Sequence, residues 1–530
     1  MLQLVKETVK KILGIGKKKP SNLIAISVEK LERRVALLED GVLEEYSVER
    51  ASDKNIVGGI FKGRVKNIEN GLKAMFVDIG FDKNAFLHFW DALPAALDSG
   101  IEEISRVDGK RKAAKKPTVK DIPSIYPVGA EVIVQVTKGP IGTKGPRVTT
   151  NLSLAGRYLV LMPYSDQSGI SRKIEDPKER ERLRKILREL EIPEGMGVIL
   201  RTVGEGQRSR FFVRDLSLLV EQWRSIEQKM KKLPAPACLF QEPDLIERTV
   251  RDFLTDEIDR VVCDDEESVK RMQDLVGQIS KRSRSRIEWH QGQIPVFENY
   301  RVEKQIEDAY HRQVWLPCGG YIVIDETEAL IAIDVNTGRN KGQGRDMDKT
   351  ILQTNLEAAE AIARQLRLRN VGGLIICDFI DMKSRKDQQS VYDRMRDRLK
   401  RDKSKTHVLP ISALGLMEMT RQRAQESISS TMFVPCPHCN GRGRVKSAES
   451  MSVELQRLLH SIMRKHRGEI HEYKVVIHPE VLQRLRTEDE DLLVDLERRY
   501  EARLTFRTDP QGSLEKFIVL DATTNQEMRG

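Results

Sequence analysis

The sequence predicts a multidomain α/β protein, and three observations support this fold class. The chain of 530 residues and 60.6 kDa is too long for a single hydrophobic core. Residues 56–150 contain the short strands and glycine-bearing turns that are typical of a small barrel. Residues 318–412 contain apolar strands on either side of an amphipathic helix, which is the pattern of a parallel crossover unit.

The composition describes a globular protein with a heavily charged surface. Hydrophobic residues make up 39% of the chain and charged residues 32%, and no run of 18 apolar residues is present, so no membrane-spanning segment is expected. The first residues lack the apolar core and the cleavage site of a secretory signal. Six cysteines at irregular positions exclude a disulfide framework, which predicts a cytoplasmic location. The net charge of +10 is a modest bias towards polyanionic partners.

The N-terminal 50 residues contain two different elements. Residues 1–20 have apolar side chains at helical spacing among lysines, as in a basic amphipathic helix that lies on an anionic membrane. A solvated tail is the simpler alternative for this segment. From Leu23 to Glu49 the apolar residues alternate in two runs, and Asp40-Gly41 between them predicts a turn that connects two strands.

The remaining segments differ in their mixture of helix and strand. Residues 151–235 combine strands with charged helices, residues 246–310 are mostly helical, and residues 446–530 form a small α/β segment. A lysine-rich stretch around residues 105–119 interrupts the strands of the expected barrel and predicts a long loop there.

Two phenylalanines of the expected barrel are candidates for stacking on nucleic-acid bases. Alternation along "KAMFVDIG" and "NAFLHFW" puts Phe76 and Phe86 on the outer face. The cationic residues Lys62, Arg64, Lys138 and Lys144 lie in the same segment. Exposed aromatic rings among cationic side chains are a common means of binding single-stranded nucleic acid. The alternative, that both rings belong to the barrel core, is left open by the pattern alone.

Two aspartates follow the apolar strands of the crossover unit. Asp334 and Asp378 lie at the carboxyl ends of these strands, where open α/β sheets bind ligands. The period of two puts Asn336 on the same face as Asp334, and Asp381 is a lesser candidate further along the chain. Carboxylate and amide oxygens suit Mg²⁺ better than zinc, and two buried carboxylates need a cation. Strand-end aspartates also serve as caps and turn formers, so the spacing alone leaves both interpretations open.

The stretch "FVPCPHCNGR" contains half of a zinc site. Cys436 and Cys439 have the spacing of a zinc knuckle, but a structural site needs four ligands and the sequence has no second pair. His438 lies between the two cysteines, where its side chain is expected to point away from a shared metal. A redox motif fits poorly, because the chain continues into glycines and arginines.

Taken together, these motifs make the chain resemble the ribonuclease E/G family. The resemblance extends over roughly residues 23–520, and its motifs are long and occur in the family's order. They are NLSLAGRYLVLMP, EGMGVILRT, IAIDVNTGR, NLEAAEAIARQLRLRNVGGLI, DFIDM, GLMEMTRQR and CPHCNGRG. Because the sequence stops after a small domain, its architecture is expected to be closest to that of ribonuclease G.

The resemblance implies a domain order for the chain. After an N-terminal extension at residues 1–20, it implies a split RNase H-like subdomain, an inserted S1-type OB-fold barrel, a 5′-sensor region, a DNase I-like catalytic subdomain, a zinc link and a small α/β domain. The split RNase H-like subdomain corresponds to residues 21–52 and 246–309, the barrel to 53–150 and the 5′-sensor region to 151–245. The DNase I-like subdomain corresponds to residues 310–432, the zinc link to 433–445 and the small domain to 446–530.

The resemblance also implies an activity. Members of the family cleave single-stranded RNA endonucleolytically with Mg²⁺, prefer AU-rich segments and 5′-monophosphorylated ends, and act in mRNA decay and in rRNA and tRNA maturation. For this chain it implies one catalytic Mg²⁺ at Asp334 and Asp378, with Asn336 orienting a carboxylate or a water, and products with 5′-phosphate and 3′-hydroxyl ends. A non-catalytic RNA-binding assembly factor is the alternative, although it leaves the aspartate pair unused.

Further residues match family positions that contact RNA. The matching residues are Phe76, Phe86 and Lys144 for RNA binding by the barrel, Arg201 and Thr202 for reading a 5′-monophosphate, and Gly156 and Val160 for the lining of the same pocket. The chain departs from the family pattern at Lys405, where an arginine is expected. Lysine keeps the charge but loses bidentate phosphate geometry, so this contact is in question.

The zinc link of the family supplies the missing half of the cysteine site. Two chains would hold one structural Zn²⁺ through Cys436 and Cys439 of each, which implies a zinc-linked homodimer that could assemble further into a homotetramer. The expected partners are therefore single-stranded RNA and a second copy of the chain. A peripheral membrane contact is conceivable only for residues 1–20.

Overall fold

The computed structural model describes most of the chain in two compact units, Met1–Thr431 and Met432–Gly530. The described residues are 22–51, 56–94, 101–104, 117–140, 144–254, 257–279, 281–339, 346–422 and 432–528. The expected N-terminal extension at 1–20 and residues 105–116 of the lysine-rich stretch lie outside the described residues. Within the described ranges no helix combines the length and the apolar character needed to cross a bilayer.

The first unit contains a mixed five-stranded sheet assembled from two distant segments. Its strands, in spatial order, are β16 (Ile287–Trp289), β15 (Arg260–Cys263), β1 (Asn22–Val28), β2 (Glu32–Glu39) and β3 (Val42–Arg50). β1 pairs antiparallel with β2 and parallel with β15. The turn between β2 and β3 lies at Asp40-Gly41, as predicted, and both residues have positive φ. Residues 22–50 and 260–289 thus share one sheet, while the RNase H-like name stays a prediction.

Helices from residues 245–310 pack against this sheet. They are α5 (Leu245–Phe253), α6 (Glu266–Ile279), α7 (Lys281–Arg284), α8 (Val296–Asn299) and α9 (Val302–Tyr310). Ile24 and Ile26 of β1 share a hydrophobic core with Val250 of α5 and Val269 of α6. The predicted strand is confirmed, but its burial does not alternate: residues 23–27 are all buried, because β1 is the central strand of the sheet.

Residues 60–149 contain a closed five-stranded barrel, which confirms the predicted barrel and is consistent with an S1/OB-like domain. Its strands, in spatial order, are β4 (Ile60–Glu69), β5 (Ala74–Asp78), β6 (Ala85–His88), β9 (Arg147–Thr149) and β8 (Glu131–Lys138), and β8 pairs back onto β4. Two short helices, η1 (Phe89–Ala92) and α2 (Ile122–Ile125), lie in its connections. Met75 and Val77 are fully buried in the barrel core, whereas Phe76 between them is half-buried.

The next sheet combines one strand from within the barrel segment with four strands that follow the barrel in the sequence. Its strands, in spatial order, are β10 (Leu154–Ala155), β11 (Leu159–Pro163), β13 (Met196–Leu200), β12 (Gly169–Ser171) and β7 (Ile101–Glu103). The helices of this part are α3 (Pro177–Glu189), η2 (Thr202–Gly204) and α4 (Ser209–Lys232). β7 comes from the barrel segment, while β14 (Ala237–Phe240), which follows α4, pairs with barrel strand β4. The barrel and this sheet therefore exchange strands in both directions.

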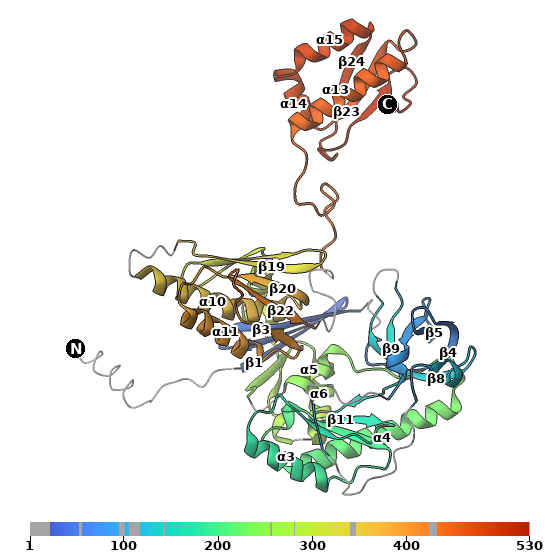
Figure 1. Cartoon of the computed structure of the whole chain (residues 1–530), viewed down its shortest axis with the longest axis vertical. Helices are drawn as coiled ribbons and strands as arrows, with labels where there is room; N and C mark the ends of the chain where they lie inside the picture. The colour runs from blue at the N-terminus through green and yellow to red at the C-terminus, as the bar shows by residue number, and fades with distance from the viewer. Residues whose placement is uncertain are drawn as a thin grey trace, which may run out of the picture. The chain divides into compact units, whose positions relative to one another are not determined.

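A six-stranded sheet follows, with helices on one face. Its strands, in spatial order, are β17 (Gln313–Trp315), β18 (Tyr321–Glu326), β19 (Leu330–Asn336), β20 (Gly373–Asp378), β22 (Leu416–Arg421) and β21 (Thr406–Val408). β18 and β19 form the predicted hairpin, and β19 and β20 are parallel on either side of α10 (Asp346–Leu368), which confirms the predicted crossover unit. Ile333 and Cys377 face the core shared with α10 and α11 (Arg385–Leu399). Figure 1 shows α10 between this sheet and β3.

The second unit is a small α/β domain. Its three-stranded sheet consists, in spatial order, of β24 (Arg503–Thr508), β23 (Glu472–Ile477) and β25 (Ile518–Asp521). Three helices accompany it, namely α13 (Ala448–Lys465), α14 (Pro479–Thr487) and α15 (Glu490–Tyr500). Their apolar faces form one core with β23, in which Leu455, Leu459 and Tyr473 are fully buried.

Candidate active site

Asp334 and Asp378 lie directly beside each other at the carboxyl ends of neighbouring parallel strands. They are register partners in the β19–β20 ladder, so their side chains emerge on the same face of the sheet. Asn336, two residues further along β19, donates a hydrogen bond from Nδ2 to Asp334 Oδ2 at 2.7 Å. The predicted approach of the two aspartates and the shared face of Asn336 are therefore confirmed.

The neighbouring carboxylates at this strand edge make Asp378 harder to ionise. The pKa of Asp378 is raised, first by partial burial and then by the negative charges of Asp334 and Asp381. Asp381, a lesser candidate in the sequence, thus belongs to the same electrostatic group. A divalent cation would relieve this repulsion, and the oxygen donors fit Mg²⁺. In the described ranges no three His, Cys, Asp or Glu side chains are arranged to enclose a metal ion.

Helix α10 fixes the loops on both sides of the carboxylates. The buried Asn355 donates from Nδ2 to the Ile380 carbonyl at 2.8 Å and accepts from the Ile380 N–H at 3.1 Å. Glu357, half a turn further on, accepts from the Cys318 N–H at 2.7 Å. Sequence reasoning misses both residues. The polar side chain of Asn355 on the apolar stripe of this helix is the pattern that could have indicated it.

The residues expected to read a 5′-phosphate meet at one end of the sheet of β10–β13. Arg201 Nη1 donates to the Gly156 carbonyl at 2.5 Å, and Nη2 pairs with Asp252 at 2.7 Å. Thr202 follows at the exposed start of η2, and Val160 lies on β11, which pairs with β13. The guanidinium of Arg201 is therefore held in a defined orientation by one carbonyl and one carboxylate.

A buried aspartate supports the turn that carries Gly156. Asp215 of α4 accepts hydrogen bonds from three consecutive backbone N–H groups, at residues 157–159, over 2.8–3.2 Å. Burial raises the pKa of Asp215, and these donors offset part of the rise. A Cβ at Gly156 would lie 2.6 Å from Asp215 Oδ2, so this position needs glycine. Sequence reasoning misses Asp215, although a charged residue on the apolar stripe of α4 could have indicated it.

The two phenylalanines of the barrel form one aromatic surface. Phe76 and Phe86 are register partners on β5 and β6, and their ring centroids lie 5.8 Å apart in an edge-to-face arrangement. Both are half-buried while their neighbours fill the core, so the predicted shared outer face is confirmed. Lys144 is exposed just before β9. Lys62, in contrast, donates to two carbonyls at the C-terminal end of α4 and pairs with Glu131.

Lys405 lies on a loop held between the six-stranded sheet and the sheet of β10–β13. Asp402 in this loop forms a buried ion pair with Arg421 of β22 at 2.6 Å. Lys173, which follows β12, donates to the Asp402 carbonyl at 2.7 Å. The Lys405 carbonyl itself accepts from the Gln422 N–H at 2.8 Å. These contacts fix the loop backbone, while the phosphate contact of the Lys405 side chain stays a prediction.

The cysteine pair lies in a turn that precedes the small domain. Gly441 and Gly443 adopt positive φ, as a knuckle turn requires. Backbone N–H groups of Cys439 and His438 lower the pKa of Cys436, which favours the thiolate form that binds metals. The pair does not open a helix, because α13 begins well after it. This arrangement agrees with the poor fit to a redox motif.

Comparisons with known proteins identify the family. The model described as "Ribonuclease E/G family" matches residues 153–424, and the model described as "RNase E/G, Thioredoxin-like domain" matches residues 435–522. Ribonuclease G of Escherichia coli (strain K12) is 38% identical over 498 residues, which cover 94% of this chain and 99% of that protein. The chain belongs to the ribonuclease E/G family.

Two other relatives differ in how much of their length this ribonuclease E/G chain matches. Ribonuclease G of Haemophilus influenzae is 36% identical over 94% of this chain and 99% of that protein. Ribonuclease E of Escherichia coli (strain K12) is 39% identical over 83% of this chain, but the match covers only 40% of that protein. The family prediction made from the sequence motifs is therefore confirmed.

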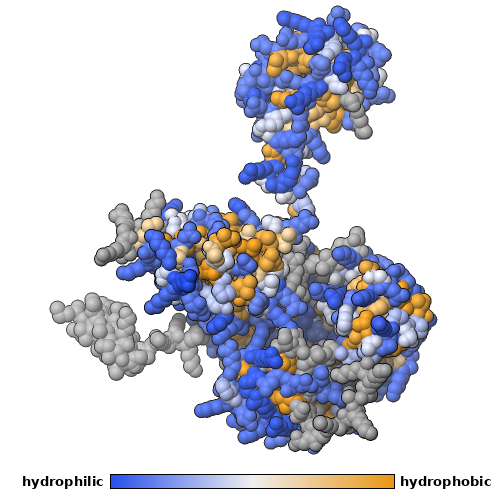
Figure 2. Space-filling model, viewed as in Figure 1, coloured by the Kyte–Doolittle hydropathy of each residue, from blue (hydrophilic) through white to orange (hydrophobic). Residues whose placement is uncertain are grey.

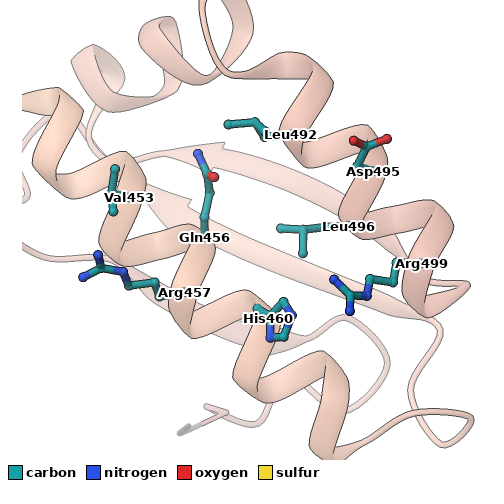
Figure 3. A pocket seen from close by; sticks show the side chains of 8 residues that line it. All are labelled: Val453, Gln456, Arg457, His460, Leu492, Asp495, Leu496 and Arg499. Carbon is teal, nitrogen blue, oxygen red and sulfur yellow. The ribbon is translucent and has the colours of Figure 1, made fainter.

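This ribonuclease E/G protein also has a pocket of about 400 Å³ in its small domain, between α13 and α15 (Figure 3). It is lined by Val453, Gln456, Arg457, His460, Leu492, Asp495, Leu496 and Arg499. None of the residues expected from the sequence to bind metal or RNA lines it. The pocket therefore shares no residue with the candidate active site on the six-stranded sheet.

Proposed function

We propose that this ribonuclease E/G family member is an endoribonuclease that hydrolyses single-stranded RNA with the help of Mg²⁺. The observation that carries the proposal is the register pair of Asp334 and Asp378, with Asn336 on the same face of the sheet. Relatives named ribonuclease G and ribonuclease E support an RNA substrate. The aromatic surface of the barrel supports binding of unpaired bases.

The side chains at the strand edge have distinct roles in this proposal. Asp334 and Asp378 hold one Mg²⁺ per chain, and Asn336 Nδ2 fixes the orientation of the Asp334 carboxylate. The bound ion supplies Lewis-acid polarisation of the phosphodiester and a lower pKa for the attacking water. Asn355 acts indirectly, because it fixes the loop that carries Asp381. Cleavage leaves a 5′-phosphate and a 3′-hydroxyl end.

A second binding site on the RNA strengthens the complex. A 5′-monophosphate binds beside the oriented guanidinium of Arg201, with Thr202, Gly156 and Val160 completing the pocket. One charge-assisted hydrogen bond contributes roughly 1.5–3 kcal/mol. This is sufficient for a preference of about tenfold or more over 5′-hydroxyl ends. The aromatic surface of the barrel and Lys144 bind the RNA in its single-stranded form.

The proposal includes an assembly and a cellular role. Within the described residues a single chain offers two neighbouring thiolates, Cys436 and Cys439, and no third ligand beside them, so two chains together complete a four-thiolate Zn²⁺ site. The result is a homodimer that can assemble further into a homotetramer. Cleavage of AU-rich RNA serves mRNA decay and rRNA and tRNA maturation in the cytoplasm.

The test of this function is a comparison of two aspartate substitutions in the same subdomain. Asp334→Asn should reduce Mg²⁺-dependent cleavage of a fluorescent single-stranded RNA by about 1000-fold or more, because the metal loses a ligand. RNA binding, measured by fluorescence anisotropy, should be retained. The matched control is Asp397→Asn, an aspartate on α11, which packs against the other face of the sheet. This control should cleave at the wild-type rate.

Three results bear on the alternative of a non-catalytic assembly factor. Normal cleavage by the Asp334→Asn variant would overturn the metal assignment. A wild-type protein that binds RNA but does not cleave it with Mg²⁺ would favour the assembly factor. Loss of wild-type cleavage on addition of EDTA and its return with excess Mg²⁺ would support the enzyme.

A further inference from the structure

Two aromatic side chains stand in line with the candidate catalytic residues. Trp315 on β17 is the register partner of Tyr321 on β18, and Tyr321 is the register partner of Asn336 on β19. Directly opposed residues in antiparallel strands project from the same face of a sheet. Trp315, Tyr321 and Asn336 therefore form a row across three strands, on the face that also carries Asp334 and Asp378.

This face of the sheet differs from the face that packs on the helices. The alternate residues of β18, β19 and β20, among them Ile322, Ile333 and Cys377, are buried against α10 and α11. Trp315, in contrast, is 58% exposed, and Leu374 on β20 is also exposed. Figure 2 shows apolar surface over part of this sheet. The face that carries the carboxylates thus offers apolar and aromatic contacts as well.

The two rings are close to each other and at a suitable distance from the carboxylates. Their centroids lie 5.3 Å apart with an interplanar angle of 61°. Two strand spacings of about 4.8 Å and two residue rises of about 3.3 Å put the Cα atoms of Trp315 and Asp334 about 12 Å apart. A nucleotide that lies close to the scissile phosphate along the chain can span this distance.

The turn after β19 leaves room beside Tyr321 and supplies a cation. Gly338 has a φ of +56°, and a Cβ there would lie 3.3 Å from the Tyr321 ring and 2.4 Å from the Gly319 carbonyl oxygen. Glycine at this position therefore allows the ring to lie against the turn. Arg339 follows Gly338 and is exposed. An exposed arginine that follows this turn in the chain is a suitable partner for the RNA backbone.

We infer that Trp315 and Tyr321 form a stacking site for one unpaired base of the substrate, next to the scissile phosphodiester. Trp315 on edge strand β17 provides the exposed ring face, and Tyr321 holds the indole in place from the side. The inference deepens the proposed ribonuclease function and rests on it. Because stacking uses the ring face that every base has, this site adds affinity and position while reading little sequence.

The site has a defined effect on the reaction. A stacked base fixes the sugar–phosphate backbone that follows it, so the phosphodiester is oriented towards Asp334 and Asp378 before cleavage. The site also requires the base to be unpaired, because a base within a duplex has no free face. Selection for single-stranded RNA would thus occur at the catalytic sheet itself, in addition to the barrel.

The test uses an RNA in which 2-aminopurine replaces one base at a time around the cleavage site. Fluorescence is measured on the Asp334→Asn background, so that the RNA stays intact. Stacking on Trp315 should quench the probe at one position. Trp315→Ala should abolish the quenching and weaken binding between about 5-fold and 150-fold, whereas Trp315→Phe should retain most of both. The control is Trp289→Ala on β16, a tryptophan that is 42% exposed on a different sheet and should change neither.

A second substrate separates stacking from a general loss of structure. An RNA with an abasic residue at the quenched position should bind the Trp315-containing protein and the Trp315→Ala variant equally. This RNA has no base to stack on the indole, so neither complex contains the stacking contact. Quenching that survives Trp315→Ala at every position would overturn the inference. So would a loss of RNA binding that follows a change from dimer to monomer in sedimentation, since Trp315 would then belong to a contact between two copies.

The same measurements distinguish failure of the stacking site from failure of the proposed function. If the wild-type protein cleaves RNA but no Trp315-dependent quenching occurs, the enzyme assignment stands and the stacking site is wrong. If quenching depends on Trp315 but the wild-type protein does not cleave with Mg²⁺, the stacking site stands and the catalytic assignment is wrong.

Discussion

Substitution of Asn355 by alanine tests how the fold positions the carboxylate loop. Asn355 does not touch the expected metal or substrate, but both polar atoms of its amide bind the backbone of Ile380. Ile380 precedes Asp381 and follows the strand that ends at Asp378. The substitution therefore removes the contact that fixes this loop and leaves every expected ligand in place.

The magnitude follows from the two hydrogen bonds. They measure 2.8 and 3.1 Å, and Asn355 is fully buried on α10. Loss of two such bonds, which leaves the Ile380 N–H and carbonyl without their partner, costs about 2–5 kcal/mol. If the loop moves by about 1 Å, cleavage should fall by about 100-fold. We therefore expect both a lower free energy of unfolding and a lower kcat.

The assay measures urea denaturation by tryptophan fluorescence together with Mg²⁺-dependent cleavage of a fluorogenic RNA. Gln365→Ala is the matched control, because Gln365 is a buried amide on the same helix whose Oε1 accepts from Arg369 Nε at 3.0 Å, away from the loop. Gln365→Ala should be destabilised but should keep its kcat below the denaturation range. An Asn355→Ala protein with wild-type kcat, or equal losses of kcat in both variants, would refute the positioning role.

Three further predictions concern the charge, the phosphate pocket and the dimer. Asp381→Asn should shift the loss of Mg²⁺ binding in acid to lower pH. The charge of Asp381 helps to raise the pKa of Asp378, and the metal requires the ionised form of Asp378. Mg²⁺ binding measured by isothermal titration calorimetry across pH 4–7 would contradict this prediction if its loss in acid occurred at the same pH in both proteins. Gly156→Ala should displace Asp215 and reduce the rate ratio between 5′-monophosphorylated and 5′-hydroxyl RNA towards one, and an unchanged ratio would count against the pocket. Cys436→Ser should give zinc-free monomers in sedimentation, since a structural zinc contributes roughly 10–16 kcal/mol in small sites. A variant that stays a stable dimer, or a wild-type protein with one zinc per chain, would exclude the shared site.

The parts of the fold that repeat regularly along the chain are readable from the sequence. Alternation with a period of two predicted which residues of β5 and β19 share a face, and the helical period predicted the apolar stripe of α10. From these faces we could predict that Phe76 lies beside Phe86 and Asp334 beside Asp378. In these cases the partner strands are each long enough to show their period. The prediction depends on local pattern and on the general rule for crossover units.

The contacts that support the sites are not readable in this way. Asn355 binds Ile380 and Asp215 binds residues 157–159, so each buried polar group is satisfied by backbone atoms far away in the sequence. Backbone atoms carry no sequence identity, and the pairing depends on how the elements pack. Lys62 shows the same limit, because its cation is used by Glu131 and by the end of α4 instead of the aromatic surface of the barrel. A strand as short as β7, with three residues, contains too few to show a period.

The exchange of β7 and β14 between the barrel and the sheet of β10–β13 has a consequence for the proposed substrate. β7 hydrogen-bonds to β12 and β14 to β4, and Arg180 and Arg184 both pair with Glu102 of β7. Two ladders formed in opposite directions resist rotation of one part about the other as well as their separation. The span from Arg201 to the aromatic surface of the barrel is then a constant of the molecule. If Arg201 binds a 5′-monophosphate as proposed, an RNA needs a minimum number of unpaired nucleotides behind its 5′ end before it can occupy both places at once.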